Sequence, residues 1–228
     1  MQVNIYQGRA PSPEAANITI VIDVIRAFTV AHYAFLRGAC NIFLAETVKQ
    51  AFRIHKEHPE FLLAGEVGGL SIEGFNLDNS PHHINDKNLR DRTLVQMTTN
   101  GVRATLNNLS SEQVFVTGFT NAKQTALFIK EKMVETSKVN IIASHPFGDD
   151  DLACAEYITS ILQESDAITK NEVIKRILNS SAAQKFFDKS EPNFKEEDIF
   201  LCAKELNSDF VMEVNKFSRT PMIERVSI

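Results

Sequence analysis

The sequence predicts an α/β protein with three layers, in which a largely parallel or mixed central sheet lies between helices. Six short apolar runs, rich in β-branched residues, alternate with longer amphipathic segments. The apolar runs are continuous rather than alternating, which is typical of strands that helices cover on both faces. From about residue 164 the sequence becomes polar and helix-forming, which predicts a helical C-terminal elaboration.

The apolar runs are expected to be strands. They occupy residues 18–24, 41–46, 61–66, 93–99, 113–119 and 139–144. Two further strands, at 209–217 and 221–228, are expected to close the sheet after the helical elaboration.

Three segments, 47–58, 121–133 and 150–163, carry apolar residues at the three- and four-residue spacing of helices packed on a sheet. Each begins with a residue whose side-chain oxygen can accept from the free amides of the first turn. These predicted N-caps are Thr47, Asn121 and either Asp150 or Asp151.

The length and composition indicate one globular domain over residues 1–228. The chain is 43% hydrophobic and 23% charged, which allows a full core. No repeat or low-complexity tract separates the helix-rich residues 164–207, so we expect an elaboration of the same domain.

The charge and the cysteine pattern restrict the partners and the compartment. A net charge of −5 and no basic stripe argue against nucleic-acid binding, whereas a few arginines could still bind a small anionic substrate. Cys40, Cys154 and Cys202 are far apart and odd in number, which fits reduced thiols in the cytoplasm. No stretch is long enough to span a membrane, and a homodimer is the default expectation for a soluble enzyme.

Polar residues follow the predicted strands at their carboxyl ends, where open α/β sheets bind ligands. Carboxylates and water suit Mg²⁺, and arginines with backbone amides suit an oxyanion. Neither a zinc motif nor a glycine-rich nucleotide motif is present. The collected residues include Asp23, Arg26, Glu66, Thr99, Asn100, Gly101, Arg103, Asn121, Asp150 and Asp151.

Local sequence alone leaves other interpretations open. Asp23 could simply cap a helix, and the run Asp149 to Asp151 could be a solvated helix start. Asn100-Gly101 could form a hairpin turn, although the following VRATLNNL favours a short helix. The glycine-rich stretch GEVGGLSIEGFNLDNSP, residues 65–81, could be a plain loop or a binding loop.

The motifs, taken in order, resemble those of the 2-phosphosulfolactate phosphatase family. They are DVIRAFTV, GEVGG, GFNLDNSP, MTTNGVRA, TGFTNA and DDLACAEYI, and they cover roughly residues 3–163. The resemblance implies a Mg²⁺-dependent phosphatase that cleaves phosphate monoesters of 2-hydroxy acids, with 2-phosphosulfolactate giving sulfolactate.

The resemblance also implies roles for individual residues. Attack by an aspartate carboxylate would form an acyl phosphate, and attack by water would avoid it; both routes stay open. The catalytic set would be Asp23, Arg26, Glu66, Asn100 and Arg103. Substrate would be bound by Asn79, Ser80, Thr99, Gly101 and Asn121, and Mg²⁺ by Asp23, Glu66 and Asp150 or Asp151.

Four positions depart from the family's motifs: Val67 stands for an arginine, Asn76 for an aspartate, and Asp78 and Glu156 for glycines. Losing an arginine removes a bidentate anion clamp. Two alternatives therefore accompany the phosphatase: a non-catalytic binder of a phosphorylated or sulfonated acid, and another Mg²⁺-dependent enzyme on the same scaffold.

Overall fold

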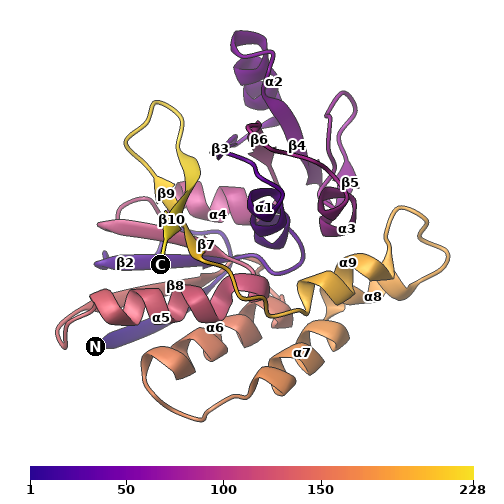
Figure 1. Cartoon of the computed structure of the whole chain (residues 1–228). Helices are drawn as coiled ribbons and strands as arrows, with labels where there is room; N and C mark the ends of the chain where they lie inside the picture. Colours follow the sequence, from indigo (N-terminus) through magenta and orange to yellow (C-terminus); the bar gives the residue numbers. More distant parts are fainter.

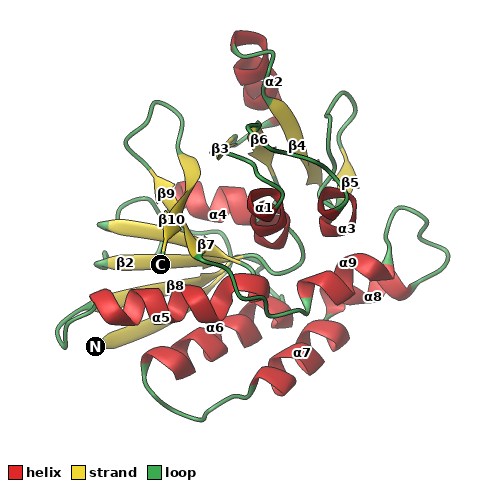
Figure 2. Cartoon of the chain, viewed as in Figure 1, coloured by secondary structure: helices red, strands yellow, loops and turns green.

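The computed structural model describes all 228 residues and has one mixed, largely parallel sheet surrounded by helices (Figures 1 and 2). The order of its strands is β1-β8-β2-β7-β9-β10-β3-β6-β4-β5. The predicted α/β class is confirmed. The strands are β1 (Gln2–Gln7), β2 (Ile18–Ile22), β3 (Asn41–Leu44), β4 (Leu62–Val67), β5 (Leu70–Ser71), β6 (Thr93–Met97), β7 (Gln113–Thr117), β8 (Lys138–Ala143), β9 (Phe210–Asn215) and β10 (Met222–Ser227).

All six apolar runs form strands, and the three amphipathic segments form helices α2, α5 and α6. The segment after Asn100 is helical, so the hairpin interpretation is wrong. The helices are α1 (Ala27–Leu36), α2 (Val48–Glu57), α3 (Pro81–Asn85), α4 (Gly101–Asn107), α5 (Ala122–Lys132), α6 (Asp149–Leu162), α7 (Lys170–Asn179), α8 (Ser181–Phe187) and α9 (Glu196–Cys202), with a 3-10 turn η1 (Phe119–Asn121).

The sheet consists of two parallel sets joined by an antiparallel hairpin. Strands β1, β8, β2 and β7 form one set, and β3, β6 and β4 form the other. The hairpin β9–β10 pairs antiparallel with β7 on one side and with β3 on the other. Three successive antiparallel pairings mean that the second set runs opposite to the first along the sheet. Figure 1 shows the two sets at a steep angle, as accumulated twist requires.

The closing strands therefore lie in the middle of the sheet rather than at an edge. Strand β9 meets β7 in register only at Glu213 and Phe115, the shortest registered pairing between neighbouring strands of the sheet. The side chains of β9 nevertheless continue the core on both sides, because Met212 and Val214 belong to one buried cluster and Val211 to the other.

Helices cover each face according to their apolar stripes. Helices α5 and α6 pack on the first parallel set and α7 packs on α6, so that Ile158 and Val173 enter one core cluster. Helix α1, which is apolar nearly all round, is buried on every side in a second cluster with Phe28 and Phe35. Such a helix has no polar face to mark its period, and this explains why its sequence does not stand out as amphipathic.

The cap predictions have a mixed outcome. The Thr47 side chain accepts from the backbone N–H of Gln50 at 3.1 Å, as predicted. Asn121 precedes α5 but its side chain makes no cap bond, and instead accepts from the N–H of Gly118 at 3.3 Å. Helix α6 begins after Gly148, so a cap by Asp150 or Asp151 is wrong.

Candidate active site

One cavity of about 410 Å³ lies where the two parallel sets meet. The carboxyl ends of β2, β4, β6 and β8 border it, and helix α8 of the C-terminal region closes one side. The lining is mostly polar and contains three cationic and two acidic side chains. It is formed by Arg9, Asp23, Ile25, Arg26, Glu66, Gly68, Gly69, Asn79, Thr99, Asn100, His145, Pro146, Phe147, Ala182, Lys185 and Phe186.

Asp23 is held at the end of β2 by donors from three elements. Its Oδ1 accepts from the N–H of Ala27 at 2.9 Å, and its Oδ2 accepts from the N–H of Gly101 at 2.8 Å. The Ser144 hydroxyl lies 3.4 Å from the same Oδ2. A Cβ at Gly101 would lie 2.7 Å from that oxygen, so the glycine allows the close approach. The two parallel sets thus meet at this carboxylate, which is 5% exposed.

Asp150 and Asp151 lie behind Asp23 and do not line the cavity. Asp151 accepts from the N–H groups of Val24 at 2.7 Å and His145 at 2.9 Å, so it ties α6 to two strand ends. Asp150 has a buried Oδ1 without a hydrogen-bond partner. The run is therefore not a solvated helix start, because two of its three carboxylates are buried.

Burial and mutual repulsion shift the pKa values of these three acids upwards. Burial, and then the Glu66 charge, raises the pKa of Asp23 to about 6 against the opposing backbone hydrogen bonds. Burial and Asp23 raise the pKa of Asp150 to about 7, and burial with Asp150 and Asp23 raises that of Asp151 strongly. Near neutral pH the three acids therefore share fewer than three negative charges, because the surrounding donors do not offset full ionisation.

We expect Asp150→Asn to stabilise the metal-free protein above pH 7. A carboxyl whose pKa is higher in the folded state stabilises the fold fully below its unfolded pKa of about 4, and this contribution is lost as the pH rises towards 7. At pH 8 in chelator, the free energy of unfolding of the variant should exceed that of wild type by on the order of 2–4 kcal/mol. At pH 4 the two should not differ. Urea unfolding with the exposed Asp166→Asn as control checks this, and equal stabilisation at both pH values would contradict it.

Glu66 organises the glycine-rich loop at the end of β4. Its Oε1 accepts from the N–H of Thr99 at 2.6 Å, and its Oε2 accepts from the Thr99 hydroxyl at 3.0 Å and the N–H of Gly69 at 2.5 Å. The Thr99 hydroxyl in turn accepts from the N–H of Gly68 at 3.0 Å. The loop is thereby fastened to the end of β6, and Glu66 and Thr99 face the cavity together.

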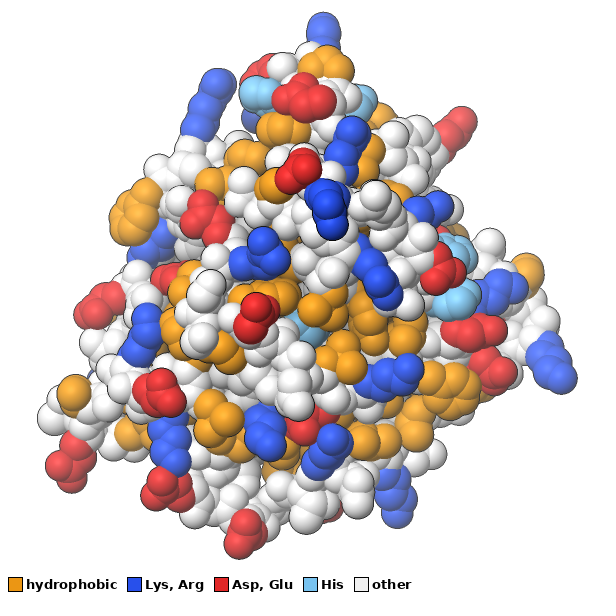
Figure 3. Space-filling view, viewed as in Figure 1, with side chains coloured by type: hydrophobic (Ala, Val, Ile, Leu, Met, Phe, Trp, Pro, Cys, Tyr) orange, Lys and Arg blue, Asp and Glu red, His pale blue; other side chains and the backbone are white.

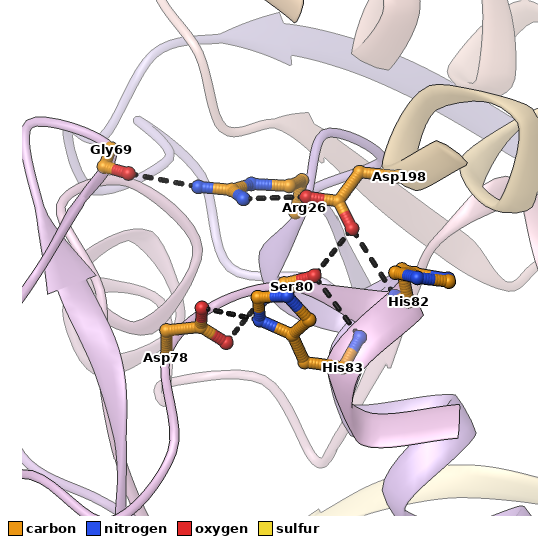
Figure 4. A network of polar contacts seen from close by, with 7 residues as sticks. All are labelled: Arg26, Gly69, Asp78, Ser80, His82, His83 and Asp198. Carbon is orange, nitrogen blue, oxygen red and sulfur yellow. Dashed lines mark hydrogen bonds and ion pairs between the residues drawn. The ribbon is translucent and has the colours of Figure 1, made fainter. Parts of the chain in front are cut away.

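Arg26 is held by a buried network that reaches the C-terminal helices (Figure 4). Its guanidinium donates to Asp198 of α9 at 2.7 Å and to the carbonyl of Gly69 at 2.9 Å. Asp198 also accepts from the Ser80 hydroxyl at 2.5 Å and from the N–H of His82 at 3.1 Å. Arg26 and Asp198 are 6% and 1% exposed, so the pair is locked rather than a mobile surface contact.

Two other cations in the cavity have no carboxylate partner. Arg9 makes one hydrogen bond, to the carbonyl of Thr99 at 3.4 Å, and Lys185 of α8 makes none. Both act on His145: burial, Arg9 and Lys185 lower its pKa, and its Nδ1 accepts from the N–H of Phe147 at 3.1 Å. The neutral ring therefore presents Nε2–H as a donor.

A model of the 2-phosphosulpholactate phosphatase family matches residues 5–216 of this chain. The chain belongs to this family. A protein of Bacillus subtilis (strain 168), named probable 2-phosphosulfolactate phosphatase, is 51% identical over 228 residues, which is 100% of both chains. A protein of Clostridium perfringens (strain SM101 / Type A) with the same name is 29% identical over 210 residues, 86% of this chain and 85% of that one. The predicted family and the predicted class, a phosphoric monoester hydrolase, are both confirmed.

The departures from the phosphatase family's motifs lie outside the cavity. Val67 is 52% exposed at the turn between β4 and β5. Asn76 accepts from the N–H of Leu63 at 2.8 Å and shapes the loop. The other two make contacts elsewhere: an Asp78 oxygen lies 2.7 Å from Nδ1 of His83, and Glu156 forms an ion pair with Arg176 of α7.

Besides Asp150, Asp151 and Gly101, three of the predicted site residues do not line the cavity. Arg103 is exposed on the outer face of α4, because a residue two positions after Gly101 points about 200° away from it. Asn121 is fully buried and bonds within its own turn. Ser80 caps α3, where its hydroxyl accepts from the N–H of His83 at 3.1 Å. Asp23, Arg26, Glu66, Asn79, Thr99 and Asn100 do come together, with Gly101 beside Asp23.

Sequence reasoning did not single out Arg9, Lys185 or Asp198. Arg9 follows β1, a strand whose polar residues hide it from a search for apolar runs. Lys185 and Asp198 lie in the helical elaboration, where lysines and acids are the expected surface residues. The available signal was weak: Asp198 is a third acid after Glu196 and Glu197, on the inward face of α9.

The oxygen donors of the cavity fit a hard cation bound through few protein ligands. Asn79 Oδ1 is buried without a partner, and Asp23 and Glu66 face the same space. No group of three or more histidine, cysteine, aspartate or glutamate side chains is arranged to hold an ion. Mg²⁺ is commonly bound by one or two carboxylates, water and substrate phosphate, so this donor set suits it.

The outer surface carries both signs of charge. Figure 3 shows lysine and arginine side chains interspersed with aspartate and glutamate over the face in view. On this face neither sign of charge dominates, so the charge that acts on a ligand is that of the cavity side chains.

No helix of the structure combines the length and the apolar composition that crossing a bilayer requires.

Proposed function

We propose that the protein hydrolyses 2-phosphosulfolactate to sulfolactate and phosphate in this cavity, with Mg²⁺ as cofactor. The observation that carries the proposal is the lining: Arg9, Arg26 and Lys185 face a space that also contains Asp23 and Glu66. Among phosphate monoesters, a substrate with several anionic groups would make use of all three cations.

The charges of this substrate match those of the cavity. It carries a phosphate, a carboxylate and a sulfonate, so the three cations oppose a crowded negative charge. Both relatives described above bear a name that refers to this compound, which supports it as the substrate. The cavity of about 410 Å³ is ample for a three-carbon acid with two further anionic groups.

Mg²⁺ would be held by Asp23 and Glu66, with Asn79 as a further oxygen donor. Asp150, with its partnerless buried oxygen, would support that end of the site from behind. A bound divalent cation would offset the repulsion that raises the pKa values of Asp23 and Asp150. When bound, it would also withdraw charge from the phosphate oxygens in the transition state.

The remaining residues of the cavity would hold the substrate in position for the reaction. Arg26, locked by Asp198, presents its guanidinium in one orientation. Thr99 and Asn100 line the wall next to Asp23, and His145 offers Nε2–H to an oxygen of the substrate. Holding the phosphate in one orientation supplies much of the rate in such reactions.

We prefer catalysis to the non-catalytic binder because the departures that motivated the binder lie outside the cavity. Val67 and Asp78 touch neither Asp23 nor Arg26. The two carboxylates and two arginines of the cavity lining are thus present despite these departures.

Phosphate release from 2-phosphosulfolactate tests the proposal directly. The chelator-treated protein should be inactive, and added Mg²⁺ should restore release by at least about a hundredfold. The assay should include 2-phospholactate and phosphoglycolate, which lack the sulfonate, at matched concentrations. Release without any metal dependence would refute the cofactor, and no release from any substrate by folded protein would refute the phosphatase.

A further inference from the structure

We propose that Lys185, on helix α8 of the C-terminal region, binds the sulfonate and so determines the preference for a sulfonated substrate. This inference rests on the proposed function and adds to it a residue outside the motifs of the first 163 residues.

The first observation is that the Lys185 ammonium has no hydrogen-bond or ion-pair partner. It is half-buried in the cavity wall, yet it forms neither a hydrogen bond nor an ion pair within 4.0 Å. Its three donors are thus available to a ligand. Burial and then Arg26 lower the pKa of this ammonium, and Glu66 and Glu191 oppose the shift only in part, so an anion from outside would stabilise its charged form.

The second observation is that Lys185 is held in place by aromatic rings. Its Nζ lies 4.2 Å from the centroid of Phe194 and 5.6 Å from that of Phe186. The Arg26 guanidinium lies on Phe186 too, at 4.9 Å. These contacts hold the Lys185 ammonium at the wall of the cavity that it lines.

The third observation separates Lys185 from the reacting centre. A Cβ at Gly69 would lie 2.7 Å from the Lys185 Nζ, so the ammonium lies against the glycine-rich loop. Asp23 instead contacts Ala27 of α1, Gly101 of α4 and Ser144 after β8. A phosphate bound beside Asp23 would therefore leave Lys185 for another anionic group of the substrate.

Chemistry favours the sulfonate over the carboxylate as that group. A guanidinium presents a planar fork that matches a carboxylate, and Arg9, whose side chain makes only one long hydrogen bond, supplies such a fork. An ammonium is a compact charge with three donors, which suits the three oxygens of a tetrahedral sulfonate. Lys185 is the one ammonium that lines the cavity.

The test compares Lys185→Met, which keeps the apolar stem, with Lys185→Arg and with the control Lys189→Met. Lys189 is exposed just beyond α8 and does not line this cavity. Phosphate release would be measured on 2-phosphosulfolactate and on 2-phospholactate, and calorimetry would measure the binding of sulfolactate and of lactate.

Lys185→Met should lower kcat/KM for 2-phosphosulfolactate by about 10- to 100-fold and that for 2-phospholactate by less than about threefold. Sulfolactate affinity should fall by a similar factor, Lys185→Arg should retain part of it, and Lys189→Met should match wild type. An equal loss on both substrates, or no loss of sulfolactate binding, would overturn the inference.

The two proposals fail in different ways. Wild-type protein that binds sulfolactate through Lys185 but releases no phosphate would refute the phosphatase and leave the sulfonate site standing. Wild-type protein that releases phosphate but prefers 2-phospholactate, or does not bind sulfolactate, would refute the sulfonate site alone.

Discussion

Replacing Asp23 by asparagine should lower kcat/KM for phosphate release by about 10³-fold or more while the protein stays folded. Asp23 is the buried carboxylate at which the two parallel sets meet, and it faces the cavity. The substitution removes a charge that would hold the cofactor or attack phosphorus, and either loss acts on the transition state. Removal of a single group from a reacting centre typically costs this much.

The measurement is single-substrate kinetics with saturating Mg²⁺, beside circular dichroism and thermal unfolding. The amide nitrogen of the new side chain would face one of the two backbone N–H donors, of Ala27 or Gly101, so a modest loss of stability is expected. Asp166→Asn, at an exposed position, is the control for a general effect of charge. Activity within tenfold of wild type would exclude Asp23 from the reacting centre.

Gly65→Ala should destabilise the fold by roughly 3–5 kcal/mol, the upper range for a single substitution. Gly65 lies in β4 at a φ of +146°, and a Cβ there would lie 1.9 Å from the carbonyl oxygen of Met97 on β6. The atom in the way is backbone within the sheet, so it cannot move aside as a flexible side chain could. The next residue is Glu66, and its alignment with Thr99 would be lost as well.

Gly68→Ala is the matched control for this prediction. Gly68 also has a positive φ, +62°, but nothing lies within 4 Å of its hypothetical Cβ. Only the left-handed conformation is penalised there, at about 1 kcal/mol. Urea unfolding of both variants separates the steric clash with the Met97 carbonyl from the cost of a positive φ. Equal destabilisation would contradict the prediction, because it would show that the backbone at Met97 moves to accommodate the Cβ.

Much of the local structure could be predicted because it depends on short segments. Six apolar runs form strands, and Thr47 caps its helix as expected. Helix α1 was not predicted because it is apolar nearly all round and shows no helical period. Strand β1 was not predicted because it lies at the edge of the sheet and contains polar residues, so it forms no apolar run.

The candidate site could be predicted only in part. Asp23, Arg26, Glu66, Thr99 and Asn100 follow strand ends, and the structure brings them into one cavity. Strand ends are expected at one edge when all strands of a sheet are parallel. Here the two parallel sets run in opposite directions along the sheet, and the twist of the sheet brings their carboxyl ends to the same cavity.

The sequence by itself determined the α/β class, the family and the identity of the acids and arginines, because these depend on local pattern and on motifs. Tertiary structure alone decided which of them face the cavity. It placed Asp150 and Asp151 behind Asp23, left Arg103 outside, and brought Lys185 and Asp198 in from the C-terminal helices. The physical reason is that twist across the β9–β10 hairpin and helix packing act between segments far apart in the chain, which no local pattern records.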